Sequence, residues 1–584
     1  MVPEAGQEAA LALGRNPNDA EALYLSGQVA LARGEVAAAA AALLRAAELA
    51  PRNAHFLHDL GVALDRAGNK REALAAFAAA VALRHDYVSA IFHSGQLHAE
   101  LGEREDARDR FSLALAFDPR SSAARIALSR LLAESEGLEA AIALLRDAIE
   151  EQTADAAVYC RLAVLLKQRG DGAGAEALYK AAIGRFPKDP APLVNLGVVE
   201  LGQSGDPGKA EALFLRALEL RPDLVEAQAN LGLALQEQGR FDEALAHYER
   251  MIPDHPDELE FRWNRGIANL ISGNFATGWE DYELRKARPD AGGVHESFKL
   301  PKWDGAPLTN RAILVYGEQG LGDEIMFASC LPDVIAQARW CVVECDARLE
   351  KLYRRSFPAA RIEPRARDRV RDWRTDCPEL ELQCAVGSLP RFMRRRQSDF
   401  PDHKGYLRAD PVAVERWRAH LRRFGTSHNV GISWRGGSLR TRSVLRSLPT
   451  AQLAALIDDL DATFVVLQRD LAAEERAMLE LRSNVYIPDG VGDPDELAAL
   501  ISALDLTISV PSTTVHLTGA LGRPLWVLLN YSPEWRYLWQ GEIMPWYPSA
   551  RLFRQPKPGD WPSVINEART AFLQGAGASA RGEE

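Results

Sequence analysis

Small and apolar residues recur at a fixed interval through the first half of the chain. Eight small residues stand 34 positions apart, with one step of 35: Gly27, Gly61, Gly95, Ser129, Ala163, Gly197, Gly232 and Gly266. Further marks keep constant offsets, as in Ala39, Leu43, Ala46 and Pro51 of one unit. This is the tetratricopeptide pattern, in which a small residue lies where two antiparallel helices cross and proline ends the second helix. The sequence predicts about eight helix pairs over residues 1–285, stacked into a right-handed superhelix.

Such a stack presents a concave groove that commonly holds an extended peptide or a partner helix. The alternative interpretation is a spacer or a dimerisation arm. The last unit replaces the usual alanines with Gly278, Trp279 and Tyr282, which indicates a cap, and Trp279 is expected to pack against the next domain. The extra residue near 202–208 is expected only to lengthen a turn.

The repeat ends near Arg285, and a polar segment leads into alternating apolar runs and helices. This alternation predicts two α/β lobes, over residues 286–425 and 426–575, followed by a flexible tail over 576–584. Strands are expected at 312–316, 340–346, 429–434, 462–468, 484–488, 506–510 and 524–529, and helices near 347–355, 411–424 and 495–504.

The first candidate site follows the apolar run Ala312–Tyr316. Gly317, Gly320 and Gly322 permit a sharp turn, and Asp323 then opens a helix. Open α/β sheets bind ligands at the carboxyl ends of strands, where helix amides can meet an anion. Gly320 and Gly322 are therefore predicted to approach a ligand, although the spacing matches neither the dinucleotide nor the P-loop fingerprint. An ordinary glycine turn is the alternative.

The second candidate site follows the strand expected at 506–510. Ser512, Thr513, Thr514 and His516 begin a helix that ends at Gly522, so hydroxyls, amides and an imidazole can hold a pyrophosphate. The alternative is that Ser512 only caps the helix and His516 packs against the neighbouring lobe.

Other side chains follow strand ends and are predicted to face the same crevice. A loop after the strand at 429–434 carries guanidinium groups suited to diphosphate oxygens, and aromatic residues after 524–529 can border a nucleobase. The residues are Trp434, Arg435, Arg440, Arg442 and Arg446, with Gln468 at the end of the next strand and Tyr531, Trp535 and Arg536 beyond. The arginine-rich stretch from Arg361 to Arg374 is interpreted as a solvated face.

Composition narrows the function. The net charge of −12 over 584 residues argues against a general nucleic-acid binder. No apolar run reaches the roughly 18 residues of a membrane span, and the amino terminus lacks a signal-peptide pattern. Six scattered cysteines fit a reducing compartment, so a cytoplasmic location is expected.

Several runs carry a family resemblance, namely WDGAPLTNRAILVYGEQGLGDEIMF, SVPSTTVHLTGALGRPLWVLL, EWRYLW and WYPSARLFRQ. The chain resembles bacterial tetratricopeptide-fused glycosyltransferases, whose catalytic half is similar to heptosyltransferases and whose architecture is similar to that of protein O-GlcNAc transferases. The resemblance implies a GT-B fold of two Rossmann-like lobes, a nucleotide-sugar in the cleft, no metal and no further cofactor. It also implies that Asp323 is the general base and that Arg446 contacts the donor phosphate. Pro511 stands where that family usually carries an aspartate, which leaves the donor sugar open.

The resemblance implies an inverting transferase that moves a sugar onto Ser or Thr hydroxyls of a protein recruited by the repeats. Similar bacterial proteins modify flagellin with nonulosonic acids such as pseudaminic acid, which makes flagellin a candidate acceptor. Two alternatives stay open: a repeat scaffold whose α/β half has lost catalysis, and a transferase acting on lipopolysaccharide glycans.

Overall fold

The computed structural model describes residues 2–287, 298, 300–365, 373–437, 443–489 and 492–579. Arg440, Arg442 and residues 366–372, which are half of the arginine-rich stretch, lie outside these ranges. The chain divides into two compact units, Met1–Leu196 with Glu219–Pro222, and Gly197–Leu218 with Asp223–Glu584. The division falls inside the repeat array and not at residue 285, because the last helix pairs pack against helices of the α/β half that follows them.

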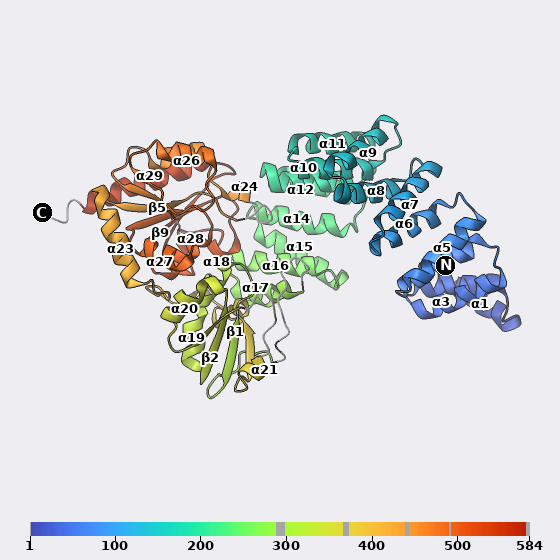
Figure 1. The fold of residues 1–584 in the computed structure, drawn as a ribbon, viewed down its shortest axis with the longest axis horizontal. Helices are drawn as coiled ribbons and strands as arrows, with labels where there is room; N and C mark the ends of the chain where they lie inside the picture. Colours follow the sequence, from blue (N-terminus) through green and yellow to red (C-terminus); the bar gives the residue numbers. More distant parts are fainter. Residues whose placement is uncertain are drawn as a thin grey trace. The chain divides into compact units, whose positions relative to one another are not determined.

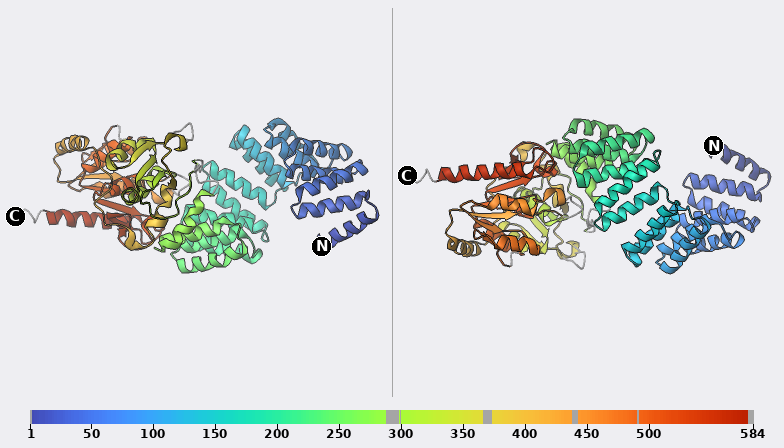
Figure 2. Two further views of the ribbon diagram at one scale, coloured as in Figure 1. Left: turned by 90° about the horizontal axis from the view of Figure 1, so that it is seen from below. Right: turned by 90° about the horizontal axis from the view of Figure 1, so that it is seen from above.

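The repeats form eight helix pairs preceded by one further helix, and each predicted small residue lies in the first helix of its pair. Within each of the two compact units, Figure 2 shows the repeat helices stacked side by side. Their bounds are α1 Val2–Arg15, α2 Ala20–Ala32, α3 Val36–Leu49, α4 Ala54–Arg66, α5 Lys70–Leu83, α6 Val88–Glu100, α7 Arg104–Phe117, α8 Ser122–Ser135, α9 Leu138–Glu150, α10 Ala156–Gln168, α11 Gly172–Arg185, α12 Ala191–Val199, η1 Glu200–Ser204, α13 Pro207–Leu220, α14 Val225–Glu237, α15 Phe241–Asp254, α16 Leu259–Ile271, α17 Phe275–Tyr282 and η2 Glu283–Lys286.

The repeated small residue has a steric cause. A Cβ atom on Gly61 would lie 2.6 Å from the ring of Phe77 in the partner helix, so only glycine lets that ring fill the crossing. The same relation joins Gly27 with Leu43, Gly95 with Phe111, Gly197 with Phe214 and Gly232 with Tyr248. The predicted repeat solenoid is confirmed.

Two sheets follow the repeats within the second unit (Figure 1). The first is parallel with strand order β3-β2-β1-β4, and the second has the order β10-β11-β9-β8-β5-β6-β7, parallel except for β10. The strands are β1 Ala312–Tyr316, β2 Trp340–Cys345, β3 Arg361–Pro364, β4 Leu382–Ala385, β5 Asn429–Ser433, β6 Thr463–Val466, β7 Val485–Tyr486, β8 Leu506–Ser509, β9 Leu525–Leu529, β10 Ile543–Met544 and β11 Tyr547–Arg554.

The helices around the sheets include those expected at the two candidate sites. They are α18 Leu321–Phe327, η3 Ala328–Cys330, α19 Leu331–Gln337, η4 Ala347–Leu349, α20 Glu350–Ser356, α21 Trp373–Asp376, η5 Val386–Ser388, α22 Pro390–Met393, η6 Gln397–Asp399, α23 Pro411–Leu421, η7 Arg422–Phe424, α24 Ser443–Arg446, α25 Thr450–Ile457, α26 Ala473–Glu480, α27 Pro494–Ser502, α28 Thr513–Ala520, η9 Trp535–Tyr537 and α29 Trp561–Ser579.

The carboxyl-terminal prediction needs correction. Helix α29 extends to Ser579, so residues 576–579 of the expected flexible tail are helical, and 580–584 lie outside the described residues. Among the helices that the structure describes, none combines the length and apolar character needed to cross a membrane.

Candidate functional site

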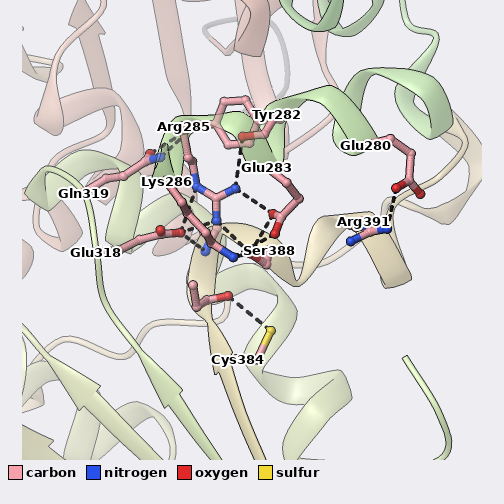
Figure 3. Close-up of polar contacts among 12 residues, drawn as sticks. Glu280, Tyr282, Glu283, Arg285, Lys286, Glu318, Gln319, Cys384, Ser388 and Arg391 are labelled. Atoms are coloured by element: carbon pink, nitrogen blue, oxygen red, sulfur yellow. Dashed lines mark hydrogen bonds and ion pairs between the residues drawn. The ribbon is translucent and has the colours of Figure 1, made fainter. Parts of the chain in front are cut away.

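The cap of the solenoid holds the glycine turn after β1. In Figure 3, Arg285 of η2 points at Glu318, the second residue of that turn. Its Nη2 donates to Glu318 Oε1 at 2.5 Å and to Ser388 Oγ at 2.7 Å, and the same carboxylate oxygen accepts the Gly387 amide at 3.0 Å. Both charged side chains are almost fully buried, at 4% and 0% exposed. The neighbouring turn residue, Gln319, hydrogen-bonds the Tyr282 hydroxyl at 3.1 Å.

Trp279 adds an apolar contact to this anchor. Its indole N–H donates to the Arg394 carbonyl at 2.8 Å, and its ring packs edge to face against Trp535 and Trp546 beside the second sheet. The expectation that this tryptophan packs against the following domain is confirmed.

Glu283 gives the anchor a pH dependence. Its carboxylate binds Arg285 and Lys286, each at 2.7 Å, and these cations outweigh the effect of burial and lower the pKa of Glu283 to about 2. A carboxylate whose pKa is lower in the folded state than in the unfolded state stabilises the fold above the unfolded value, near 4.5. We expect this contribution to disappear as pH falls from about 4.5 to 2. Urea unfolding across that range should show a shallower decline for Glu283→Gln than for the wild type, and parallel curves would contradict the assignment.

Asp323 lies in the first turn of α18, where the glycine turn ends. Its Oδ1 is ion-paired with Arg536, and its side chain is 23% exposed. Arg536 also approaches Glu534 at 3.4 Å and lies 4.8 Å from the ring centroid of Trp535. Its pKa is raised because Asp323 and Glu534 outweigh the cost of burial. The arginine therefore stays charged and fixes the orientation of the Asp323 carboxylate.

Glu324, which sequence reasoning did not single out, has a structural role. Its carboxylate accepts the Asp346 amide at 2.6 Å and Arg365 Nη2 at 2.8 Å, which ties α18 to the end of β2. Burial raises the pKa of Glu324 to about 7, against the opposing effect of Arg365. The acidic pair Asp323–Glu324 was the available signal, but sequence does not show which member turns inward.

A cavity of about 560 Å³ opens at the carboxyl ends of β5, β6 and β8. Five of the predicted ligand-binding residues line it: Arg435, Gln468, Ser512, Thr513 and Thr514. Leu321 and Arg348 contribute from the first sheet's side, so the cavity lies between the two lobes. Arg348, Arg435 and Arg469 outnumber the one acidic residue of the described lining, Asp470, and this excess of positive charge suits an anionic ligand.

The amino end of α28 faces this cavity without a side-chain cap. Ser512 occupies the N-cap position but makes no capping hydrogen bond, and its hydroxyl lies 3.0 Å from that of Ser509. The alternative that Ser512 merely caps the helix is therefore wrong in this geometry. The positive end of the helix dipole is directed at the cavity, where a phosphate would be stabilised.

Gly436 permits the close approach of the two loops that form this end of the cavity. A Cβ atom there would overlap the carbonyl oxygen of Pro511, which belongs to backbone and cannot swing aside. We expect Gly436→Ala to push the loops apart and weaken the binding of an anion in this cavity about tenfold, because misplaced donors lose their hydrogen bonds. Calorimetric titration with nucleoside diphosphates measures the effect. Gly492→Ala, on the same cavity wall with open space around its Cβ position, is the matched control.

Other predicted residues lie elsewhere. Trp434 is 1% exposed in the core of the second lobe and donates to Glu475 at 3.0 Å, so its predicted ligand contact is not supported. The same glutamate binds Arg435 at 2.9 Å. Trp535 is 6% exposed within the aromatic cluster around Trp279. An aromatic after a strand end fits a core as well as a ligand face, and the sequence does not distinguish them.

His516 and Arg446 also differ from their predicted placement. His516 does not line the cavity: its Nδ1 lies 3.1 Å from the Tyr547 hydroxyl, and burial lowers its pKa to about 3. A Cβ atom on Gly322 would lie 2.9 Å from its ring, so His516 packs against the first lobe, as the alternative stated. Arg446 is buried in α24 and ion-paired with Glu534. Gly320, the N-cap of α18, and Gly322 in its first turn are both absent from the cavity lining, so their predicted approach to a ligand is not supported.

The first half of the chain is a tetratricopeptide-repeat solenoid, and an α/β half follows it. Family profiles described as tetratricopeptide repeat match residues 4–54, 58–122, 126–190 and 229–291, and a second such profile matches 191–253.

Known proteins extend the comparison. Protein FlbA of Caulobacter vibrioides is 28% identical over 88% of this chain and 83% of its own length. Superkiller complex protein 3 of Mus musculus is 26% identical over 44% of this chain and 17% of its own length, and human protein O-mannosyl-transferase TMTC1 is 29% identical over 29% and 20%. Among solved structures, yeast Tom70 is 20% identical over 43% of this chain and 54% of that one, with a TM-score of 0.38.

Proposed function

We propose that the protein is a glycosyltransferase that moves a sugar from a nucleotide-activated donor to Ser or Thr hydroxyls of a protein recruited by its repeats. In this proposal the α/β half works as a GT-B enzyme. The observation that carries it is the apposition of two helix starts: the Cβ position of Gly322 in α18 lies 3.6 Å from Thr513 Cα in α28. Asp323 follows Gly322 in α18, so in this proposal its carboxylate acts from beside the end of α28 that would hold the diphosphate, while the residues that line the basic cavity hold the nucleotide.

The chemistry follows from this arrangement. The diphosphate of the donor is held by the amides and hydroxyls of Ser512, Thr513 and Thr514, with Arg435 and Arg348 adding positive charge. Asp323 takes the proton of the acceptor hydroxyl, the hydroxyl oxygen bonds to the anomeric carbon, and the bond from that carbon to the diphosphate breaks. Attack from the face opposite the leaving group inverts the anomeric centre. Helix amides and arginines neutralise the departing charge, so the proposed reaction needs no metal.

The names of two similar proteins support a protein as the acceptor. Two human proteins with similar stretches are named protein O-mannosyl-transferases, although the matches cover 29% and 12% of this chain. A protein hydroxyl is the acceptor that fits a repeat solenoid, because an extended peptide needs a long groove and a lipopolysaccharide glycan does not. Flagellin as acceptor and a nonulosonic acid such as pseudaminic acid as donor are the specific candidates. Because Pro511 stands where similar enzymes carry an aspartate, the donor sugar has to be found by testing several nucleotide-sugars.

Two measurements test the proposal. Calorimetry with CMP and with uridine, guanosine and adenosine diphosphates should show saturable binding of one of them. Incubation with flagellin and a panel of nucleotide-sugars, including CMP-pseudaminic acid, should add one or more sugar masses in an intact-mass spectrum. Absence of heat with every nucleotide would favour the scaffold alternative, and transfer to lipopolysaccharide but to no protein would favour the glycan-directed one.

A further inference from the structure

A second cavity, of about 250 Å³, lies where the sixth helix pair meets the loops that follow β9 and β11. We call it the junction pocket. Its apolar wall includes Leu201 of the repeats, Leu445 of α24, and Tyr531 and Trp561. It shares Val444 and Ser447 with the basic cavity described above, so the two cavities are neighbours.

Most of the repeat residues in the wall of the junction pocket come from the repeat that carries the extra residue, and Glu237 of α14 adds one from the next repeat. The extra residue between Gly197 and Gly232 takes the form of a π-helical turn over Glu200–Ser204, and Gly205 then adopts a left-handed φ of 63°. Leu201, Gly205 and Pro207 from this segment all line the pocket. The expectation that the insertion only lengthens a turn is therefore incomplete, and such π turns are frequent at functional sites.

Two buried amides leave polar atoms unsatisfied at this pocket. Asn530, 7% exposed, uses its Nδ2 to donate to the Ser532 carbonyl at 2.6 Å, which leaves Oδ1 without a partner among the described residues. Gln555, 5% exposed, uses Oε1 to accept the Tyr531 and Gly559 amides, which leaves Nε2 without a partner among them. Because the other end of each amide is engaged, the two groups cannot simply exchange oxygen and nitrogen. A buried hydrogen-bonding atom without a partner is costly unless a ligand or water satisfies it.

The charge of the lining selects the ligand class. Among the described residues that line the junction pocket there is no lysine or arginine, and Glu237 is the one charged side chain. A phosphate or nucleotide is therefore disfavoured there, in contrast to the basic cavity. The pocket fits an apolar group, and Asn530 Oδ1 and Gln555 Nε2, which are buried in residues of its wall, would pair with one donor and one acceptor beside that group once these side chains turn toward it. A peptide unit carrying a bulky aliphatic or aromatic side chain has this combination.

We propose that the junction pocket binds an apolar side chain of the acceptor polypeptide and thereby selects which hydroxyls are modified. The identity of the peptide as an acceptor rests on the proposed function, whereas its chemical class rests on the pocket alone. The π turn places repeat residues in the wall, so a chain held by tetratricopeptide helices meets this pocket beside the donor cavity.

The test uses the full-length protein and a minimal probe. N-acetyl-L-leucinamide carries an isobutyl side chain between peptide-like donors and acceptors, and N-acetyl-L-glutamic acid 1-amide is its charged counterpart. Ligand-observed saturation-transfer NMR should show saturable binding of the leucine probe in the millimolar range expected of so small a ligand. The glutamate probe should bind at least about tenfold more weakly because its carboxylate meets no cation.

Variants locate the binding. Leu445→Trp fills the pocket and Asn530→Leu removes the acceptor atom, and each should weaken the leucine probe about tenfold or more. Leu481→Trp, which adds the same indole at a position 86% exposed in the same lobe, should leave binding unchanged. Circular dichroism melting curves identify any variant that has lost its fold. A crystal soaked with the probe reports the site independently of all variants.

The outcomes separate this proposal from the function it extends. Three results would overturn the peptide-binding role of the junction pocket and leave the proposed transferase intact. They are nucleotide binding without binding of the leucine probe, a soaked crystal in which the pocket holds only water, and probe binding that Leu445→Trp does not change. Probe binding that the variants abolish, in a protein that binds no nucleotide, supports the peptide pocket and removes the transferase.

Discussion

Replacing Asp323 with asparagine will lower sugar transfer by about a thousandfold while changing nucleotide affinity by less than about threefold. The asparagine amide keeps the shape of the carboxylate but cannot take the proton from the hydroxyl of the acceptor protein. Nucleotide contacts are preserved because Asp323 does not line the basic cavity. Transfer is measured by mass spectrometry under single-turnover conditions and affinity by calorimetry.

The matched control for this prediction is Asp333→Asn. Asp333 is also paired with a buried arginine, Arg394 at 2.7 Å, but it lies in α19 and not in α18, the helix that packs against α28. Its substitution tests whether loss of an aspartate–arginine pair is enough to stop turnover. Asp323→Glu should recover part of the activity with a changed pH profile, which a purely structural aspartate would not produce. Unchanged turnover in Asp323→Asn would remove Asp323 as the base.

The regular parts of this molecule could be predicted from sequence because their causes are local or repeated. The solenoid follows from a small residue that recurs opposite a large one, as with Gly61 and Phe77. The turn from β1 into α18 follows from an apolar run, glycines and an acidic helix start. Strands β3, β4, β10 and β11 were not predicted. The buried and exposed residues of β11, for example, do not alternate regularly.

The contacts that complete the site could not be predicted, because they join residues far apart in the chain. Arg536 binds Asp323 from 213 residues away, and no local pattern marks either as the other's partner. Trp434 was misplaced because a tryptophan at a strand end fits both a buried core and a ligand-binding surface. Only its packing in the core of the second lobe decides between the two. The steric need for Gly436 likewise depends on Pro511, which the chain brings to it through the strand order.

The contact between Arg285 and Glu318 predicts the largest effect on stability. Arg285→Met removes the cation that compensates a fully buried carboxylate, and the oxygen atoms of Glu318 cannot regain water. We expect the free energy of unfolding of the second unit to fall by about 3–5 kcal/mol, the cost of leaving one member of a buried ion pair alone. Urea unfolding followed by tryptophan fluorescence measures the loss, because Trp279 and Trp535 pack beside this anchor.

The chain supplies both a control and a rescue for that measurement. Arg391 and Glu280 form an ion pair at 2.5 Å near the same cap, but their side chains are 38% and 43% exposed (Figure 3). Arg391→Met should therefore cost less than about 1 kcal/mol. Adding Glu318→Gln to Arg285→Met should restore part of the stability, since a neutral amide tolerates burial better than an unpaired charge. If Arg285→Met and Arg391→Met unfold at the same urea concentration, the buried pair does not hold the glycine turn. The orientation of Asp323, five residues beyond Glu318, would then have to come from Arg536 alone.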